Sequence, residues 1–428
     1  MHAKKISADL LFATFGEVSQ KVVGYLVLVL LARHLDKGSM GEFFVAGTIA
    51  TIAAAIAELG TGRHLVRQVA ASPADALAHL GGVLSLRLPV TAAALVVVNA
   101  TIYLLAPALG SVMLLTSCYV LVGDLYYSYS AFLVGRRLLG LRLVTLLGGQ
   151  LLLVACVGLS VFAGGSLTMV LVAYVAANVI TVGSTALLVR HRFGPVPLSW
   201  PSTRSWQLAR VAAPFGALTV LGLLHSKVDT LLLYRLSSAA TVASYESAYK
   251  LLEVSRFLVR PAVTVFFPIC AALAAAENWS GFELAYRRLL RAAGGLGLLV
   301  AALVISLAGA VVPAIWGASY ADSVPIVRVL YLSVPLLYLQ LVALFLAGSV
   351  HLERAAFWAV AAAFAGNLVL NLIAIPRWGA MGASITTLAS EAALTTWLLC
   401  LIRNHLRAVK QPGRMLSGDS LAASASAA

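Results

Sequence analysis

Long runs of apolar residues, separated by short polar or basic stretches, fill most of this 428-residue chain. An α-helix rises about 1.5 Å per residue and the hydrocarbon core of a bilayer is about 30 Å thick, so runs of this length can cross it. Twelve runs qualify, at roughly 9–32, 41–60, 80–105, 110–134, 141–164, 167–189, 210–234, 242–270, 292–315, 324–348, 355–375 and 380–402. The pattern predicts an all-α, polytopic membrane protein with about twelve transmembrane helices.

One predicted span carries an unusual number of charges. Within residues 244–268, Lys250, Glu253, Arg256 and Arg260 follow one another at spacings of three, three and four, which on a continuous helix places them on one face. A charge near the bilayer centre costs about 3 kcal/mol or more unless it faces protein or water. We expect this row to line an aqueous cavity. The alternatives are ion pairs that join helices, or a row near a helix end that extends to the interface.

The composition excludes a soluble domain. Hydrophobic residues make up 61% of the chain and charged residues only 11%, with a mean hydropathy of +0.95, whereas roughly a quarter of the residues are charged in soluble domains. A net charge of +14 would suggest nucleic acid in a soluble chain, but here most cations lie in short loops between apolar runs. We therefore expect no nucleic-acid partner. The four cysteines lack CxxC spacing, so neither a metal site nor a disulfide framework is indicated.

The loop cations predict the orientation of the chain. Nineteen Lys and Arg residues fall on the side of the termini, and five fall on the other side, namely Arg33, Lys37, Arg235, Arg328 and Arg377. Positive loops stay in the cytoplasm, so both termini are expected there. The first apolar run contains Glu17 and Lys21 and is not followed by an A-x-A-like site, which predicts a retained helix rather than a cleaved signal.

The chain is expected to consist of two halves. The Pro-containing loop at 190–209 divides the spans six and six, and a constant offset of 202 residues aligns Leu31 with Leu233 and Arg33 with Arg235. A repeat separated by six spans is parallel in topology, and substrate sites of such transporters lie between the halves. We predict lobes at 1–189 and 210–403, and a cytoplasmic, disordered tail at 404–428.

Four stretches of the chain resemble a known family. They are Leu30–Ala70, Lys227–Leu251, Trp316–Leu330 and Asn367–Glu391. In this order they resemble the oligosaccharide and polysaccharide lipid-carrier flippases of the multidrug/oligosaccharidyl-lipid/polysaccharide (MOP) exporter superfamily. The resemblance implies a MATE-like, V-shaped pair of six-helix lobes with alternating access. It also implies export of a polyprenyl diphosphate-linked sugar chain across a bacterial or archaeal cell membrane, with polysaccharide assembly proteins as possible partners.

The cations inside predicted spans are the candidate substrate ligands. A lipid diphosphate carries an anionic linker, which Lys250, Arg256 and Arg260 could bind together with Lys227 and Lys21. Arginine donates paired hydrogen bonds to phosphate, whereas lysine acts as a point charge. A structural alternative for Lys21 is an ion pair with Glu17, four residues earlier. Arg87, near the start of the third span, is expected to extend to the interface.

The intramembrane carboxylates and histidine are candidates for ion coupling. The chain has no GxxxxGK[ST] sequence that could bind ATP phosphates, so transport is expected to be secondary or downhill and to need no cofactor. His225 and Asp229 share a helix face, and with Glu253 they are candidate H⁺ or Na⁺ sites. Equally, Asp229 and Glu253 could be fixed counter-ions of Lys227 and Lys250.

Two further polar groups have a structural and a functional interpretation. Asp124 lies beside several tyrosines and could contact sugar or be a counter-ion, although an interfacial aromatic belt also explains the tyrosines. Asn367 and Asn371 share a face of the eleventh span, where hydrogen bonds between helices are favoured over ligand contacts.

Membrane enzymes and antiporters are the other function classes that a basic, polytopic protein could belong to. A membrane glycosyltransferase or polysaccharide polymerase would be expected to show a DxD-like pair or a long outer loop, and the chain has neither, so we expect no enzyme activity. An ion-coupled multidrug or small-molecule antiporter of the same superfamily is the stronger alternative. Its cavity would be expected to hold aromatics and carboxylates rather than surplus cations.

Overall fold

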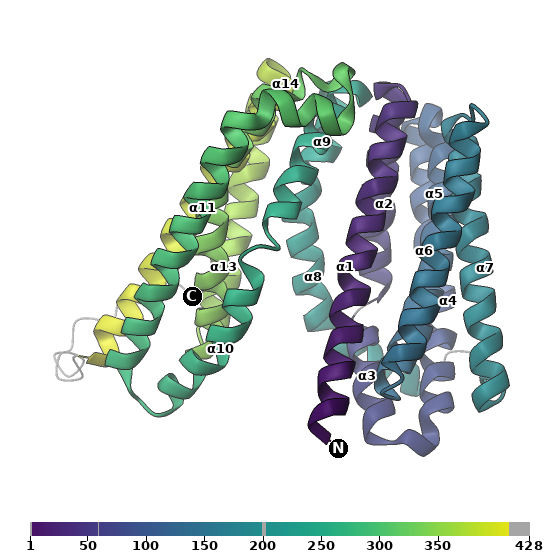
Figure 1. Ribbon diagram of the computed structural model, residues 1–428, viewed down its shortest axis with the longest axis horizontal. Helices are drawn as coiled ribbons and strands as arrows, with labels where there is room; N and C mark the ends of the chain where they lie inside the picture. The colour runs from purple at the N-terminus through teal and green to yellow at the C-terminus, as the bar shows by residue number, and fades with distance from the viewer. Residues whose placement is uncertain (1, 59, 199–202, 411–428) are drawn as a thin grey trace. The chain divides into compact units, whose positions relative to one another are not determined.

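The computed structural model describes residues 2–58, 60–198 and 203–410, and within these ranges the regular structure is helical. Because each apolar run satisfies its own backbone hydrogen bonds only as a helix, this is the architecture that a bilayer demands. The helices run roughly side by side within each part of the chain (Figure 1). The predicted all-α membrane fold is confirmed.

The first part of the chain contains seven long helices and one short amphipathic helix. Their bounds are α1 His2–His34, α2 Lys37–Glu58, α3 Thr61–Ala71, α4 Ala76–Leu105, α5 Gly110–Gly135, α6 Leu139–Phe162, α7 Leu167–Phe193 and α8 Thr203–Leu236, with short 3₁₀ turns at Pro73–Asp75 and Pro107–Leu109.

The second part begins with a broken helix pair. Its elements are α9 Ala239–Ser255, α10 Arg260–Ala275, α11 Trp279–Trp316, a 3₁₀ turn at Ala318–Tyr320, α12 Ser323–Tyr331, α13 Val334–Ser349 and α14 Glu353–Lys410. The last element is two helices joined at Gly379, whose φ of 52° falls in the left-handed region that glycine tolerates.

These helices correspond roughly to the twelve predicted spans. Among the described residues, eight helices are long and apolar enough to cross a membrane. Two bent pairs each make a further span, one at 239–275 with a bend of 45° and one formed by α12 and α13 with a bend of 43°. Gly379 divides α14 into two helices, which correspond to the predicted spans at 355–375 and 380–402. Helix α8 corresponds to the predicted span at 210–234. The short helix α3 was not among the predicted elements.

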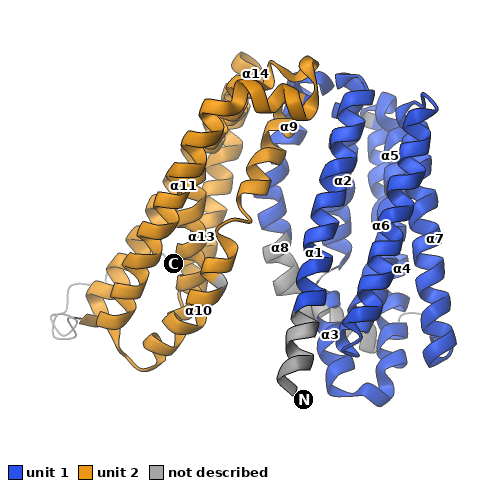
Figure 2. Cartoon of the chain, in the orientation of Figure 1, with its two compact units in different colours: residues 1–243 blue, residues 244–428 orange. Residues whose placement is uncertain are grey.

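Contacts divide the chain into two compact units, residues 1–243 and 244–428 (Figure 2). In the first unit α8 packs against α2, α3 and α4, so the unit includes a helix that the sequence assigned to the second lobe. The predicted lobes at 1–189 and 210–403 therefore stay a prediction. Residues 404–410 of the predicted tail continue α14 as a helix, and the rest of that tail lies outside the described residues.

The core of the first unit lies where α3 joins the long helices. Leu65 and Val69 on α3 are buried against apolar residues of α4, α5 and α7, among them Leu80, Phe132 and Val189. Leu65 and Val69 are four residues apart and so lie on one face of α3. Their packing holds α3 against the ends of the neighbouring helices. The amphipathic pattern of α3 follows from this position, because only one of its faces is covered.

Helix α2 begins at a well-formed cap. The carboxylate of Asp36 accepts hydrogen bonds from the backbone N–H and the hydroxyl of Ser39, at 3.0 and 2.6 Å. Both hydrogen bonds favour the charged form of the Asp36 carboxyl and so lower its pKa below the usual value. The bond from the Ser39 hydroxyl has the larger effect, and the bond from the Ser39 backbone N–H adds to it. The cap satisfies N–H groups that the first turn of a helix leaves without partners.

Candidate functional site

The charged stretch at residues 244–268 is a broken helix rather than a continuous one. Helix α9 ends at Ser255 and α10 begins at Arg260. Pro261 lies in the first turn of α10; it cannot donate to the carbonyl of Phe257, and its ring would clash with that carbonyl in a continuous helix. The expected single charged face is therefore wrong. Lys250 and Glu253 lie on α9, Arg256 lies in the break, and Arg260 starts the next helix.

Two tyrosine hydroxyls stabilise the end of α9. The Tyr331 hydroxyl donates to the carbonyl of Leu251 at 2.8 Å, and the Tyr338 hydroxyl donates to the carbonyl of Ser255 at 2.5 Å. The backbone N–H of Leu258 also donates to the Ser255 carbonyl, at 3.1 Å. The last carbonyls of a helix lack intrahelical partners, and inside a membrane they must find others. Residues of α12 and α13 provide them.

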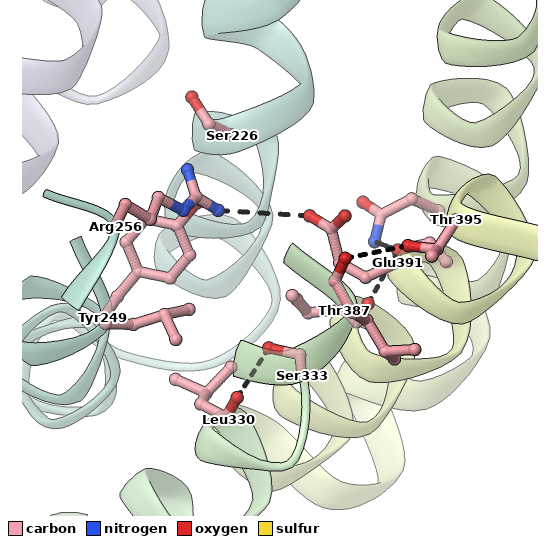
Figure 3. A network of polar contacts seen from close by, with 12 residues as sticks. Ser226, Tyr249, Arg256, Leu330, Ser333, Thr387, Glu391 and Thr395 are labelled. Carbon is pink, nitrogen blue, oxygen red and sulfur yellow. Dashed lines mark hydrogen bonds and ion pairs between the residues drawn. The ribbon is translucent and has the colours of Figure 1, made fainter. Parts of the chain in front are cut away.

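Arg256 extends from this break toward a buried carboxylate (Figure 3). Its Nη2 lies 4.0 Å from Oε1 of Glu391, on the second helix of α14, and donates to the Tyr249 hydroxyl at a long 3.5 Å. Its guanidinium carbon also lies 5.8 Å from the centre of the Tyr249 ring. The Arg256 side chain is 32% exposed and that of Glu391 only 6%. The ion pair thus joins a nearly buried anion to an accessible cation.

The donors of Arg256 are only partly used. A guanidinium has five N–H donors, and among the described residues the Nε of Arg256 has no hydrogen-bond partner. The contacts of Nη2 with Glu391 and Tyr249 are both longer than the 2.7–2.9 Å of a strong charge-assisted hydrogen bond. The Nε atom is itself buried, so an incoming anion would meet the terminal nitrogens, where the long contacts of Nη2 leave no tight pair to break.

The neighbouring charges are arranged differently from the predicted row. Lys250 donates to Glu253 at 2.7 Å, three residues along α9. This geometry is the one expected of a fixed counter-ion, and a role of either residue in substrate binding or ion coupling stays a prediction. The guanidinium of Arg260 lies 4.9 Å from the centre of the Phe257 ring. Arg256 is a cation of this stretch that faces a carboxylate of another helix.

Hydrogen bonds join the two helices of α14 beside Glu391. Asn367 donates to the Ser390 hydroxyl at 3.1 Å, Asn371 donates to Asn367 at 2.9 Å, and the Thr386 hydroxyl donates to Asn371 at 2.5 Å. Both asparagines are buried. This is the interhelical arrangement that the sequence favoured for them, and it fixes the helix that carries Glu391.

A separate ion pair is buried in the first unit. Arg87 on α4 pairs with Asp124 on α5, and the two side chains are only 2% and 8% exposed. Arg87 also donates to Ser128 at 3.1 Å, and the Thr91 hydroxyl donates to Asp124 at 3.2 Å. The expectation that Arg87 extends to the interface is wrong, because a carboxylate inside the unit neutralises it. Asp124 is the counter-ion in this pair, and its predicted role in sugar or ion binding is untested.

The remaining predicted residues lie on α1 and α8 of the first unit. Glu17 and Lys21 are exposed on α1; on α8, His225 and Lys227 are half-buried and Asp229 is buried. The candidate cations are therefore divided between the two units, with Lys250, Arg256 and Arg260 in the second. A shared cavity lined by all of them stays a prediction.

Sequence reasoning missed Glu391 and Tyr249. Glu391 lies inside the last predicted span, at residues 380–402, and an intramembrane carboxylate is by itself a functional candidate. That signal was present in the sequence. The pairing with Arg256 was not, because it depends on how α14 packs beside the break. Among the described residues, no group of three His, Cys, Asp or Glu side chains could hold a metal ion.

Comparisons with known proteins give a family and a fold. A profile of the family described as "Polysaccharide biosynthesis protein" matches residues 6–274, more than half of the chain. No curated protein matches the sequence.

Among solved structures, the lipid II flippase MurJ in an inward closed conformation has a TM-score of 0.73 at 11% identity, over 92% of this chain and 87% of that chain. An inward-facing multidrug resistance MATE family transporter of the MOP superfamily has a TM-score of 0.70 at 14% identity, over 91% and 96%. A MOP superfamily transporter from Pyrococcus furiosus has a TM-score of 0.63 at 16% identity, over 95% of each chain.

Proposed function

Because the chain belongs to the family of polysaccharide biosynthesis proteins and has the fold of MOP superfamily transporters, we propose that it is a flippase for a polyprenyl diphosphate-linked oligosaccharide or polysaccharide repeat unit. The cargo moves from the inner to the outer leaflet by alternating access, without ATP. One of the similar structures is a lipid II flippase, which supports a lipid-linked cargo. Both termini face the cytoplasm, as the charge bias of the loops indicates.

The observation that carries this proposal is the state of Arg256. It lies at a break inside a membrane span, its side chain is partly accessible, and the contacts of its Nη2 with Glu391 and Tyr249 are long. A diphosphate presents several acceptor oxygens and negative charge, which match a guanidinium through paired hydrogen bonds. Arg260 and Lys250 are the further candidate ligands on the same stretch. In the first unit, Lys21 and Lys227 complete the set that we propose.

Energy for transport is proposed to come from the cargo gradient or from a coupled cation. The chain lacks a phosphate-binding loop for ATP. Asp229, which is buried on α8, and Glu391 are the carboxylates that we consider first for a proton or sodium ion. Glu253 and Asp124 are the further candidates, and each pairs with a cation, as Glu391 does.

A second candidate function is ion-coupled antiport of a small molecule. It is favoured by buried carboxylates such as Asp124 and Glu391 and by the likeness to a multidrug resistance transporter. The surplus cations within spans favour the flippase instead.

The two functions are separated by a competition experiment in proteoliposomes. The purified protein is reconstituted and the translocation of a fluorescent lipid-linked oligosaccharide is measured, with the unlabelled lipid-linked sugar or cationic drugs as competitors. A flippase is inhibited by an unlabelled lipid-linked sugar and does not accumulate drug. Drug uptake driven by an ion gradient, with no lipid-linked sugar translocated, would establish the antiporter and refute the proposal.

A further inference from the structure

Two helices of the second unit extend well beyond their apolar spans. Helix α11 has 38 residues, which corresponds to about 57 Å against a hydrocarbon thickness of about 30 Å. Its apolar part is the predicted span 292–315, so residues 279–291 project from the membrane. Helix α14 continues past its span at residue 402 and ends at Lys410, on the same side as the C-terminus.

These extensions pack against each other. The ring of Trp279 on α11 lies 5.7 Å from that of His405 on α14, and Glu283 on α11 forms an ion pair with Lys410. The inner faces are apolar and buried, with Phe282, Tyr286 and Leu289 on α11 and Ile402 and Leu406 on α14. Spacings of three and four place each set on one side of its helix. The extensions are thus an ordered pair of helices at the membrane surface.

The outer faces of the same turns are basic. Six cations are exposed there, namely Arg287, Arg288 and Arg291 on α11 and Arg403, Arg407 and Lys410 on α14. Glu283 accepts from Arg287 at 2.5 Å as well as from Lys410, and Glu277 is the other carboxylate of the region. Six cations against two carboxylates leave a surplus of four positive charges. Like charges three and four residues apart repel each other unless an anion lies between them.

We propose that this basic face binds the headgroups of anionic phospholipids in the leaflet on the side of the C-terminus. Clusters of four to eight Lys and Arg residues next to a transmembrane helix attract anionic lipids within a Debye length of the surface. Arginine matches the phosphate of a headgroup through paired donors. Trp279, half-buried beside the cluster, is the residue type that prefers the interfacial region. The inference does not depend on the cargo, because it involves none of the residues around Arg256.

The test compares two variants that lose the same charge. Arg288→Gln/Arg403→Gln/Arg407→Gln removes three cations that lie outside the Glu283 ion pairs. Arg235→Gln/Arg328→Gln/Arg377→Gln removes three exposed cations elsewhere in the chain and is the control. Fluorescent phosphatidylglycerol is titrated into full-length protein in a neutral detergent, with fluorescent phosphatidylcholine as the uncharged comparison.

The first variant is expected to bind phosphatidylglycerol more weakly by on the order of a hundredfold, since each cation near the surface contributes about fivefold. The control variant and phosphatidylcholine binding should change by less than about twofold. If the triple variant does not fold, the single variant Arg407→Gln should show the fivefold loss. Unchanged phosphatidylglycerol affinity, or an equal loss in the control, overturns the proposal. Displacement of the lipid by millimolar pyrophosphate also overturns it, because the face would then be a site for soluble anions.

Discussion

At the scale of single residues, the proposed function depends on how Arg256 is shared between Glu391 and an incoming anion. Glu391 is nearly buried and Arg256 is its cation across helices. Removing only the arginine leaves a carboxylate within the membrane that has lost a favourable charge, which is the costly case. Removing both groups leaves a neutral pair of side chains.

This arrangement predicts the outcome of a double-mutant cycle. Arg256→Ala should lower the free energy of unfolding by about 1–3 kcal/mol, and Arg256→Ala/Glu391→Gln should regain most of that loss. Transport should stay impaired in the double variant, since the phosphate ligand is still missing. Thermal unfolding in detergent and the flipping rate are measured for all four proteins. Full recovery of transport in the double variant would show that Arg256 serves only to neutralise Glu391.

The cap of α2 gives a prediction for pH. The hydrogen bonds from Ser39 lower the pKa of the Asp36 carboxyl in the folded protein. The charged carboxylate therefore stabilises the folded state at pH values above the pKa that Asp36 has in the unfolded chain. This stabilisation is lost as the pH falls through the lower pKa of the folded state. Asp36→Ala should cost about 0.5–1 kcal/mol at pH 7, the lower part of the range for N-caps because Asp36 is exposed. The difference from wild type should shrink below about pH 4. A difference in unfolding that stays constant from pH 7 to pH 3 would contradict this.

Sequence analysis predicted which residues carry charge in the membrane but not how they pair. Lys250 and Glu253 are close in sequence, so a local spacing rule suggested their pair. Glu391 and Asp124 meet arginines from other helices, and a single sequence contains no rule for such distant pairs. Arg87 was misplaced for the same reason.

At the scale of elements, the break between α9 and α10 sets the direction in which Arg256 points. The apolar runs correspond roughly to the helices of the described residues, because a run inside a bilayer must satisfy its own backbone hydrogen bonds. The break itself was missed, although Pro261 is visible in the sequence. Proline often only kinks a transmembrane helix, and the tyrosines that stabilise this break come from α12 and α13.

The tyrosine contact can be tested by removing one hydroxyl. Tyr338→Phe should lower the free energy of unfolding by about 1 kcal/mol, because the Ser255 carbonyl loses one of its two donors but keeps the N–H of Leu258. Tyr103→Phe is the matched control, since Tyr103 is 70% exposed at the end of α4. Chemical or thermal unfolding in the same detergent measures both. Equal stability of the two variants would mean that the break needs no support from the Tyr338 hydroxyl.

At the scale of the whole molecule, the composition predicted the helical membrane class, the loop charges predicted an orientation, and the resemblance of four stretches to known flippases implied the family. The two compact units divide between residues 243 and 244, because α8 packs on α2, and the six-helix lobes expected from the sequence stay a prediction. Whether α8 packs on α2 depends on whether the side chains on the two helix faces fit together. Proline-containing loops mark where a chain can be divided and do not determine which helices pack together.

The orientation is tested with a reporter placed at two positions of the chain, one at the C-terminus and one on the opposite predicted side. A reporter that is active only outside the cytoplasm should give no signal after Lys410 and a signal in the turn at Ala318–Tyr320 ahead of Arg328, because the cations concentrate on the side of the termini. A signal at the C-terminus would contradict the cytoplasmic placement of the termini.

The central claim is that Arg256 contacts the diphosphate of a lipid-linked sugar, and the flipping rate in proteoliposomes tests it most directly. Equal amounts of folded wild type, Arg256→Ala, Arg256→Lys and the control Arg377→Ala are reconstituted, and translocation of a lipid-linked oligosaccharide is followed at subsaturating substrate. We expect Arg256→Ala to lose roughly ten- to a hundredfold, which corresponds to about 1.5–3 kcal/mol for charge-assisted hydrogen bonds. Arg256→Lys should retain part of the rate, and Arg377→Ala all of it. Wild-type rates in Arg256→Ala would contradict the account.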